Sequence, residues 1–403
     1  MTPSSAPSRR DFVTLGTLAT AGFGMVQDAL AAENNPAVTV ADRSSSIRIT
    51  DFKMWWINPV VFIRIDTNHG VSGWGEIKAI DPRVGMALMT SLFELLKDEN
   101  PTRIEHLWQK LYRAHRDIRG GAFMTHVIAG IDIALWDLAG KLWGVPVYRL
   151  LGGPVRDRIR VYHTPKAQKV PPHGIYEHSG TPADIERMVK AIAAAREKVG
   201  PDGAVMFDAH SAVPPATLIQ LAAALKPYDV LFIEEPAVPG NIEVFKRLKQ
   251  AINIPLATGE RDRTIWGVIP YLQERCIDVL QPDCCHTGGI SQMRKIAALA
   301  ETYSVPLAPH CTASNLGISA SIHATAATAL FLIHEFYPTN MGFNPRGIAM
   351  IDWTVDKEGY AALPQGVGLG VDMDAKILDE EAKKPQTYKW PGAKLKDGSI
   401  ADY

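Results

Sequence analysis

The stretch AVMFDAH at residues 204–210 sets the pattern that decides the fold, because an apolar run ends there in an acid followed by a histidine. Five later runs, among them LFIEE at 231–235 and LAPH at 307–310, end in the same kind of residue. The six ends are Asp208, Glu234, Glu260, Asp283, His310 and Glu335, separated by 26, 26, 23, 27 and 25 residues. One strand, one helix and two loops take about that many residues, so the spacing predicts a parallel β/α barrel.

The carboxyl ends of all the strands open on one face of such a barrel, so these side chains are expected to share a pocket. Asp208, Glu234 and Glu260 would repel one another and raise each other's pKa unless a cation lay between them. Three carboxylates leave octahedral positions for water and substrate, as Mg²⁺ prefers, so we predict one Mg²⁺ per subunit. The alternative is a helix cap or surface charge at each junction, which suits one acid better than three on consecutive strands.

His310 and Asp283 end neighbouring predicted strands. A carboxylate beside an imidazole fixes its tautomer and raises its basicity, so we predict that this pair acts as a general base. The alternative is a structural core histidine with a capping aspartate. His210 lies two residues past Asp208 and is expected to serve as an acid opposite the base.

Glu335 ends the last predicted strand and is expected to hold a substrate oxygen. A protonated carboxyl with a raised pKa would do so as a hydrogen-bond donor. The neighbouring His334 should point away and be structural. Further candidates for substrate contact, each with a purely structural alternative, are His163, His286, Arg261 and the loop Arg119-Gly120-Gly121.

The residues before the barrel indicate an α+β domain, because strand patterns come first and helical patterns follow. Strands are predicted to start at 47–49 and to occupy 60–66 and 71–76, and helices to occupy 82–97, 103–115 and 125–143. We assign this domain to residues 47–152, the barrel to 153–355 and a segment that returns to the first domain to 356–403. Barrel helices are predicted at 182–199, 215–225, 242–251, 265–274, 291–303 and 316–329.

The N-terminus indicates an export signal over residues 1–31, followed by a linker over 32–46. Twin arginines in Ser8–Val13 precede a weakly apolar stretch, and Ala29-Leu30-Ala31 offers a cleavage site. A twin-arginine signal predicts a periplasmic protein, and the alternative is a disordered tail with a chance arginine pair. The stretch is too short and too glycine-rich for a permanent membrane anchor.

Composition excludes several other classes of protein. The 403 residues are 46% hydrophobic and 21% charged, which is typical of a soluble globular protein. The net charge of −1 leaves no basic surplus for nucleic acid, and we expect no membrane partner after signal removal. The four cysteines lack metal-ligand spacing, so buried free thiols are the favoured interpretation, although an exported protein could form disulfides.

Several motifs together identify a known family. They are Gly73-Trp74-Gly75-Glu76, Ile233-Glu234-Glu235-Pro236, Ala257-Thr258-Gly259-Glu260, Gln281-Pro282-Asp283 with Gly288-Gly289-Ile290, and Ala308-Pro309-His310. From residue 47 onward the chain resembles the mandelate racemase branch of the enolase superfamily. Phe207-Asp208-Ala209-His210 and His334-Glu335-Phe336 make it most similar to acid-sugar dehydratases of the galactonate type.

The resemblance implies a modified TIM barrel of (β/α)7β type, an N-terminal capping domain, and a homo-oligomer such as a dimer or octamer. It also implies that Mg²⁺ holds the carboxylate of a sugar acid while His310, supported by Asp283, removes the C2 proton. His210 would protonate the departing C3 hydroxyl and Glu335 would steady the enediolate. The product would be a 2-keto-3-deoxy sugar acid.

One departure from the family pattern concerns the second barrel unit. Only 46 residues separate Tyr162 from Asp208, and the stretch 165–181 is too short for a full helix and strand. We therefore expect a shortened second unit. The paired-lysine strand of racemases is not evident, because Lys166 and Lys169 are widely spaced and near prolines, which argues against a lysine base.

Two alternatives to a dehydratase remain. One is an epimerase, racemase or cycloisomerase on the same scaffold. The other is a sugar-acid binding protein that has lost catalysis, although the complete set of ligands and base argues against that loss.

Overall fold

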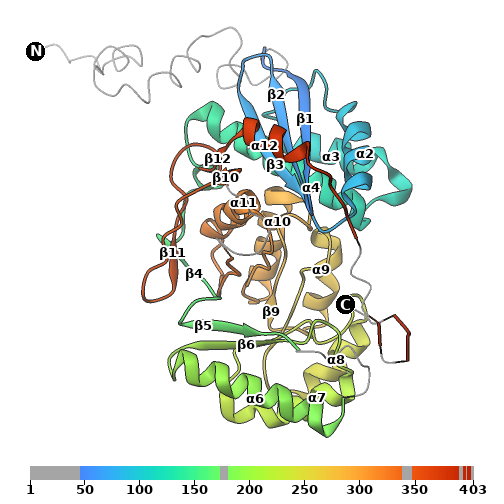
Figure 1. Ribbon diagram of the computed structural model, residues 1–403, viewed down its shortest axis with the longest axis vertical. Coiled ribbons are helices and arrows are strands. Elements are labelled where there is room, and N and C mark those ends of the chain that lie inside the picture. The colour runs from blue at the N-terminus through green and yellow to red at the C-terminus, as the bar shows by residue number, and fades with distance from the viewer. Residues whose placement is uncertain (1–45, 173–179, 338–346, 390–393, 396, 401–403) are drawn as a thin grey trace, which may run out of the picture.

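The computed structural model describes residues 46–172, 180–337, 347–389, 394–395 and 397–400. The predicted export signal lies outside these residues, as does all of the linker but Ser46. Figure 1 shows an N-terminal layer of strands and helices stacked on a larger β/α unit.

The N-terminal domain is an antiparallel sheet covered by helices. Its strands β1 (Ile49–Ile57), β2 (Val60–Thr67) and β3 (Ser72–Ile77) lie in the order β1-β2-β3. The helices are α2 (Pro82–Phe93), α3 (Ile104–Ala114), α4 (Ala122–Trp143) and α5 (Val147–Leu150), with the 3-10 turn η2 (Arg116–Ile118). The sequence analysis predicted only where the first strand starts, at 47–49. The observed strand runs on through residues 51–57, which pair with β2.

Helix α4 packs directly against β3, which fixes the middle of this domain. A Cβ at Gly73 would lie 1.9 Å from the carbonyl oxygen of Ala134, and one at Gly75 would lie 2.0 Å from that of Gly130. Glycine is therefore required at both strand positions for the helix to come this close. Most of α4 is buried, as expected for a helix that is apolar around most of its circumference.

The barrel wall is a parallel sheet in the order β5-β6-β7-β8-β9. Its strands are β5 (Ala167–Val170), β6 (Ala204–Asp208), β7 (Ile233–Glu234), β8 (Leu256–Thr258) and β9 (Val279–Leu280). Single parallel bridges continue the wall from Leu280 to Leu307, from Leu307 to Phe331, and from His334 to Val161, which follows β4 (Arg158–Arg160). The outer helices are α6 (Pro182–Val199), α7 (Pro215–Leu225), α8 (Ile242–Ala251), α9 (Thr264–Gln273), α10 (Gly289–Thr302) and α11 (Asn315–Ala326), with the 3-10 turn η3 (Lys226–Tyr228) after α7.

Several barrel strands are shorter than predicted. The apolar runs that end at His310 and Glu335 form only isolated bridges, and the run that ends at Asp283 contributes only the two residues of β9. Pro282, Pro306 and Pro309 have no N–H to donate, so a continuous ladder cannot form through them.

The second unit is shortened, as expected, and the structure shows how. Residues 161–166 connect β4 to β5 and contain no helix, and an antiparallel bridge between Thr164 and Ala167 closes the turn. The second strand and its following helix α6 are both present. The missing part is therefore the helix between the first two barrel strands.

The C-terminal segment contributes β10 (Ala349–Met350), β11 (Tyr360–Ala362), β12 (Asp372–Met373) and α12 (Ala375–Ala382). Strand β11 pairs antiparallel with β4, and β10 pairs with β12. The indole N–H of Trp55 donates to Asp379 at 2.7 Å, so α12 is tied to β1 (Figure 1). All four cysteines are buried and free, which confirms the interpretation as thiols.

Candidate active site

The alternation of side chains along the barrel strands explains which residues face the interior. Met206, Phe232, Ala308 and Ile333 belong to the small cluster that fills the barrel. Because strand side chains alternate with a period of two, the residue two positions further on faces the same side. Those residues are Asp208, Glu234, His310 and Glu335.

A lysine whose side chain is only 10% exposed joins three of these acids. Lys169 Nζ lies 2.7 Å from Glu234 Oε1, 2.9 Å from Glu335 Oε1 and 3.3 Å from Asp208 Oδ2. Asp208 and Glu234 are also direct partners in the β6–β7 register. Four side chains that are far apart in sequence therefore meet at the carboxyl end of the barrel.

The sequence analysis did not place Lys169 in the site, but the structure does. It is the third residue of β5, and Ala167 of the same strand lies in the barrel interior. The period-two rule that places the acids places Lys169 on the same inner face. Lys166, the other lysine considered, is exposed and lies outside the site.

Burial and neighbouring charges set the ionisation of this group. Burial opposes the charge on Lys169, but Glu234, Glu335 and Asp208 outweigh it and raise the pKa of Lys169 well above its usual value. Burial and the charge of Asp208 raise the pKa of Glu234. Burial would also raise the pKa of Glu335, but Lys169 and His310 lower it well below its usual range. The prediction that Glu335 is a protonated donor is therefore wrong, because two cationic partners keep it ionised.

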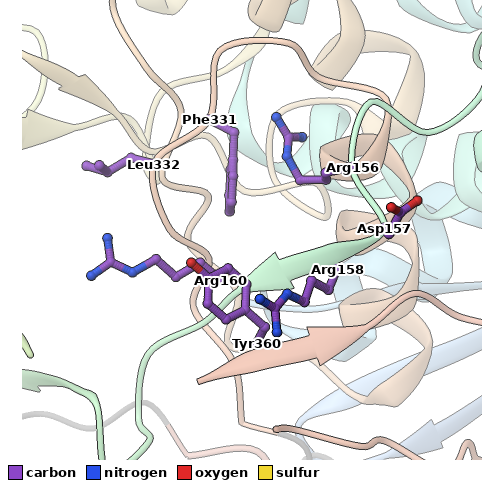
Figure 2. Close-up of a pocket in the computed structure, with 7 residues that line it drawn as sticks. All are labelled: Arg156, Asp157, Arg158, Arg160, Phe331, Leu332 and Tyr360. Carbon is purple, nitrogen blue, oxygen red and sulfur yellow. The ribbon is translucent and has the colours of Figure 1, made fainter. Parts of the chain in front are cut away.

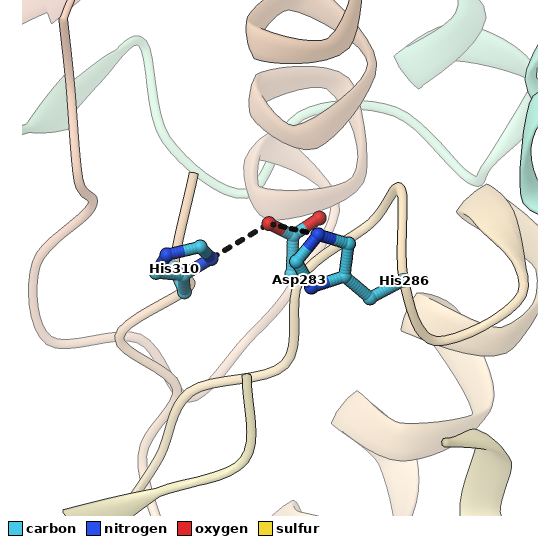
Figure 3. Close-up of side chains that lie close together, drawn as sticks. All are labelled: Asp283, His286 and His310. Carbon is cyan, nitrogen blue, oxygen red and sulfur yellow. Dashed lines mark hydrogen bonds and ion pairs between the residues drawn. The ribbon is translucent and has the colours of Figure 1, made fainter. Parts of the chain in front are cut away.

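His310 and Asp283 are in direct contact (Figure 3). His310 Nδ1 donates to Asp283 Oδ2 at 2.7 Å, so the other ring nitrogen carries the lone pair when the ring is neutral. That nitrogen, Nε2, lies 3.6 Å from Glu260 Oε2 and 3.7 Å from Glu335 Oε2. Burial opposes protonation of His310, but the carboxylates Glu260, Glu335 and Asp283 raise its pKa to about 10.

His210 lies at the rim of the same pocket. Its Nδ1 is 3.7 Å from Asp208 Oδ2 and 3.9 Å from Glu235 Oε2. The hydrogen bond to Asp208 is the main reason that the pKa of His210 rises to about 9. Its side chain is 36% exposed, so it can meet a ligand that enters from solvent.

The donor chemistry of the three predicted ligands fits a hard divalent cation. Asp208, Glu234 and Glu260 are all buried carboxylates, and the raised pKa of Glu234 reflects burial and like charge. Among the described residues, the compact groups of three ligand atoms within 4.8 Å are His210, Glu235 and Glu260, and Asp283, His286 and His310. The predicted trio is not among them, and two of its members, Asp208 and Glu234, contact Lys169 Nζ instead.

The remaining candidates are divided between the pocket and the scaffold. His163 is in the pocket, with Nε2 3.5 Å from Glu335 Oε1 and its ring stacked on Tyr337. His334 bonds Ser321 Oγ at 2.7 Å, which confirms its structural interpretation. Arg261 Nε donates to Glu235 Oε1 at 2.6 Å and so orients a buried acid.

The last two candidates contact residues of the scaffold. His286 is buried and lies 2.8 Å from Lys78 Nζ, which favours its structural alternative. Arg119 of the proposed loop stacks over Tyr112 in the N-terminal domain, with its guanidinium carbon 5.7 Å from the ring centre.

A cavity of about 640 Å³ lies elsewhere and does not belong to this site (Figure 2). It is lined by residues of β4 and by Phe331, which stand at the amino ends of their strands. Arg156 in its wall donates to the carbonyls of Thr325 and Ala329, and Arg158 pairs with Asp356. The acids and histidines described above stand at the opposite, carboxyl ends.

Comparisons with known proteins agree with the arrangement of the two domains. Residues 40–152 match the family described as mandelate racemase / muconate lactonizing enzyme, N-terminal domain, and residues 158–377 match enolase C-terminal domain-like. The D-galactonate dehydratase of Variovorax paradoxus is 34% identical over 85% of this chain and 96% of its own length. That of Xanthomonas euvesicatoria is 35% identical with the same coverage.

Solved structures show the same fold. The structure of an enolase from Agrobacterium radiobacter, bound by sodium and L-malate, has a TM-score of 0.78 and 32% identity, covering 88% of this chain and 99% of that one. The 3,6-anhydro-D-galactonate cycloisomerase of Zobellia galactanivorans has a TM-score of 0.75 and 29% identity, covering 83% and 99%. The predicted capped barrel is thereby confirmed.

Proposed function

The chain belongs to the mandelate racemase / muconate lactonizing enzyme family of the enolase superfamily, and from that premise we propose a galactonate-type acid-sugar dehydratase that depends on Mg²⁺. It is a lyase that acts on a sugar acid. The observation that carries the finer proposal is the hydrogen bond from His310 Nδ1 to Asp283, which leaves Nε2 facing the buried acids.

The first step is removal of the proton on C2 of the sugar acid by Nε2 of His310 in its neutral form. A cation held by Glu260 would offset part of the carboxylate charge that raises the pKa of His310. Asp283 accepts the hydrogen bond from Nδ1 and stabilises the imidazolium that forms. The proton α to a carboxylate is very weakly acidic, so the step requires strong electrostatic stabilisation of the enediolate.

Members of the enolase superfamily bind Mg²⁺, and Asp208, Glu234 and Glu260 are the residues that would hold it here. When bound, the ion supplies positive charge that stabilises the carboxylate and enediolate oxygens. Lys169 contributes a second cation at the same end of the barrel, since its ammonium lies beside Asp208, Glu234 and Glu335.

The second step is loss of the C3 hydroxyl. His210 stands at the exposed rim beside Asp208, with a raised pKa, so it enters the reaction as the protonated acid. Glu335 is ionised and therefore accepts a hydrogen bond from a substrate hydroxyl, in place of the donor role first assigned to it. The resulting enol tautomerises to a 2-keto-3-deoxy sugar acid.

A keto-acid assay across aldonates and glucarates tests this function. We expect turnover of at least one aldonate, and His310→Ala and Glu234→Ala should each lose about three or more orders of magnitude in kcat/KM. The exposed residues His106 and Glu243 provide matched controls as His106→Ala and Glu243→Ala. No keto acid from any substrate, with Mg²⁺ present, would contradict the proposal.

Epimerisation or cycloisomerisation is the second candidate, and Lys169 favours it. A lysine and a histidine in one pocket could exchange protons on two faces of the same carbon. Proton NMR in D₂O separates the reactions, because epimerisation incorporates deuterium at C2 without loss of water, whereas dehydration gives a keto acid.

Export through the twin-arginine segment and assembly into a homo-oligomer are part of the proposal. Cell fractionation with Arg9→Lys and Arg10→Lys together should move the protein from the periplasm to the cytoplasm. Light scattering of the mature chain should give a multiple of the protomer mass. A cytoplasmic wild-type protein, or a monomer, would contradict the respective part.

A further inference from the structure

A lysine of the N-terminal domain reaches the back of the catalytic pair. Lys78 follows β3 directly, and its side chain is 1% exposed. We propose that Lys78 is a positioning residue, which the N-terminal domain contributes to hold the Asp283 carboxylate in the orientation that directs His310 at the substrate. This inference rests on the proposed role of His310 as base.

The contacts hold both oxygens of Asp283. Lys78 Nζ lies 2.9 Å from Asp283 Oδ2, the same oxygen that accepts from His310 Nδ1 at 2.7 Å. The backbone N–H of Cys285 donates to the other oxygen, Oδ1, at 2.7 Å. With both oxygens engaged, the carboxylate cannot rotate without losing a hydrogen bond.

His286 accepts the second contact of the ammonium. Lys78 Nζ lies 2.8 Å from His286 Nε2, and His286 Nδ1 lies 3.0 Å from the carbonyl oxygen of Glu260. The carbonyl can only accept, so Nδ1 is the protonated nitrogen and Nε2 is the acceptor for Lys78. The same lysine therefore ties Asp283 to the loop that carries Glu260.

Helix α4 of the N-terminal domain holds the backbone of Lys78 and the ring of His286, which accepts from its ammonium. His126 of α4 donates from Nδ1 to the carbonyl oxygen of Lys78 at 2.8 Å. Its ring also stacks on His286 with centres 4.5 Å apart and an angle of 7°. The lysine is thus clamped between β3, α4 and the barrel loop, and docking of the N-terminal domain sets where it lies.

The chemistry of the surrounding donors explains why a cation is needed there. Asp283, His286 and His310 offer ligand atoms within 4.8 Å of one another, an arrangement that suits a cation (Figure 3). Lys78 supplies that cation from the chain itself. A buried ion pair contributes little to stability on average, so a role in orientation accounts better for this one.

The kinetic test compares Lys78→Met, which keeps the length of the side chain and removes its charge, with Lys53→Met at an exposed position of β1. We expect kcat of the Lys78 variant to fall about 10- to 100-fold. KM should stay within about threefold, because Lys78 is positioned to act through Asp283 and not on the substrate. The Lys53 variant should match wild type.

Charge-specific rescue guards against a variant that folds poorly. Lys78→Ala leaves room for an added amine, so propylamine should restore kcat at least about tenfold, whereas 1-propanol should not. A variant with unchanged kcat, a rise in KM alone, or equal rescue by the alcohol would overturn the positioning role.

A spectroscopic measurement separates this inference from the proposed function. The far-downfield proton of His310 Nδ1, assigned by its loss in His310→Asn, should shift in Lys78→Met and return with propylamine in Lys78→Ala. This result does not need turnover, so it stands even if no sugar acid is dehydrated. An unshifted resonance in both Lys78 variants would overturn the inference.

Discussion

Two buried lysines organise the pocket, and their surroundings differ in charge. Lys169 lies within 3.3 Å of three carboxylates, those of Asp208, Glu234 and Glu335. Lys78 contacts one carboxylate, Asp283, and a neutral histidine. The first group therefore retains an excess of negative charge that a further cation could neutralise, whereas the single carboxylate of the second is already paired with Lys78 and His310. This difference is why we propose the metal at the first group.

Removal of metal should have the largest effect and tests this contrast directly. EDTA treatment should reduce kcat about 1,000-fold or more, because the charge that stabilises the enediolate is lost. Mg²⁺ at 100 times its Kd should stabilise the folded protein by about 2.7 kcal/mol. Activity assays and thermal unfolding with and without Mg²⁺ measure both effects.

The variant Lys78→Met should respond to EDTA as wild type does, since Lys78 serves the other group. Full activity of the wild-type enzyme after exhaustive EDTA treatment would contradict the proposal that the group around Lys169 needs a metal ion.

Replacement of Lys169 should have the next largest effect. Lys169→Met leaves three buried carboxylates without the ammonium that contacts them, so we expect a loss of about 3 kcal/mol in the free energy of unfolding. We also expect kcat/KM to fall about 100-fold, because an ionic contact at the reacting end of the pocket is removed. Urea unfolding and kinetics with saturating Mg²⁺ measure these changes.

Lys166→Met is the matched control, because Lys166 is exposed three residues earlier in the chain. If both variants lost the same activity, the particular role of Lys169 would be excluded. A smaller stability loss with Mg²⁺ than without it would show that the metal and the ammonium neutralise the same acids.

The smallest effect concerns a histidine outside both lysine groups. His323 Nδ1 accepts the backbone N–H of Tyr148, and burial lowers the pKa of His323 to about 4. Its unfolded pKa is about 6.5, so the neutral ring contributes stability above that pH, and this stability is lost as the pH falls toward 4. Between pH 7 and pH 5 we expect a loss of about 2 kcal/mol from this residue.

Urea unfolding at pH 7 and pH 5 should therefore show a shallower pH dependence for His323→Gln than for wild type, with activity at pH 7 unchanged. His106→Gln, at an exposed position, should keep the wild-type dependence. An identical pH dependence in all three proteins would contradict the buried neutral state of His323.

The barrel and the contact between Asp283 and His310 could be predicted because both follow from local patterns. Apolar runs about 25 residues apart predict repeated strand and helix units, and the residue at the end of each run faces the barrel mouth. Asp283 and His310 end adjacent units, so the sequence predicts that they lie close together, and in the structure His310 Nδ1 and Asp283 Oδ2 are 2.7 Å apart. The shortened second unit was predictable for the same reason, since chain length limits what 17 residues can form.

The sequence analysis missed Lys169. The four residues of β5 are too few to show alternation clearly, and the following prolines suggested a loop. Only the parallel pairing of β5 with β6 establishes which face Lys169 occupies. The ionised state of Glu335 depended on this lysine, so the error about its pKa followed from the first omission.

Lys78 and His126 could not be identified from sequence, because nothing local marks them. Lys78 lies 205 residues before Asp283, and their contact exists only because the N-terminal domain docks on the barrel. The sequence by itself determined the repeat, the residue types at the strand ends and therefore the class of chemistry. The tertiary structure decided which cation neutralises which acid, because ionisation depends on burial and on distances of a few ångströms between segments remote in sequence.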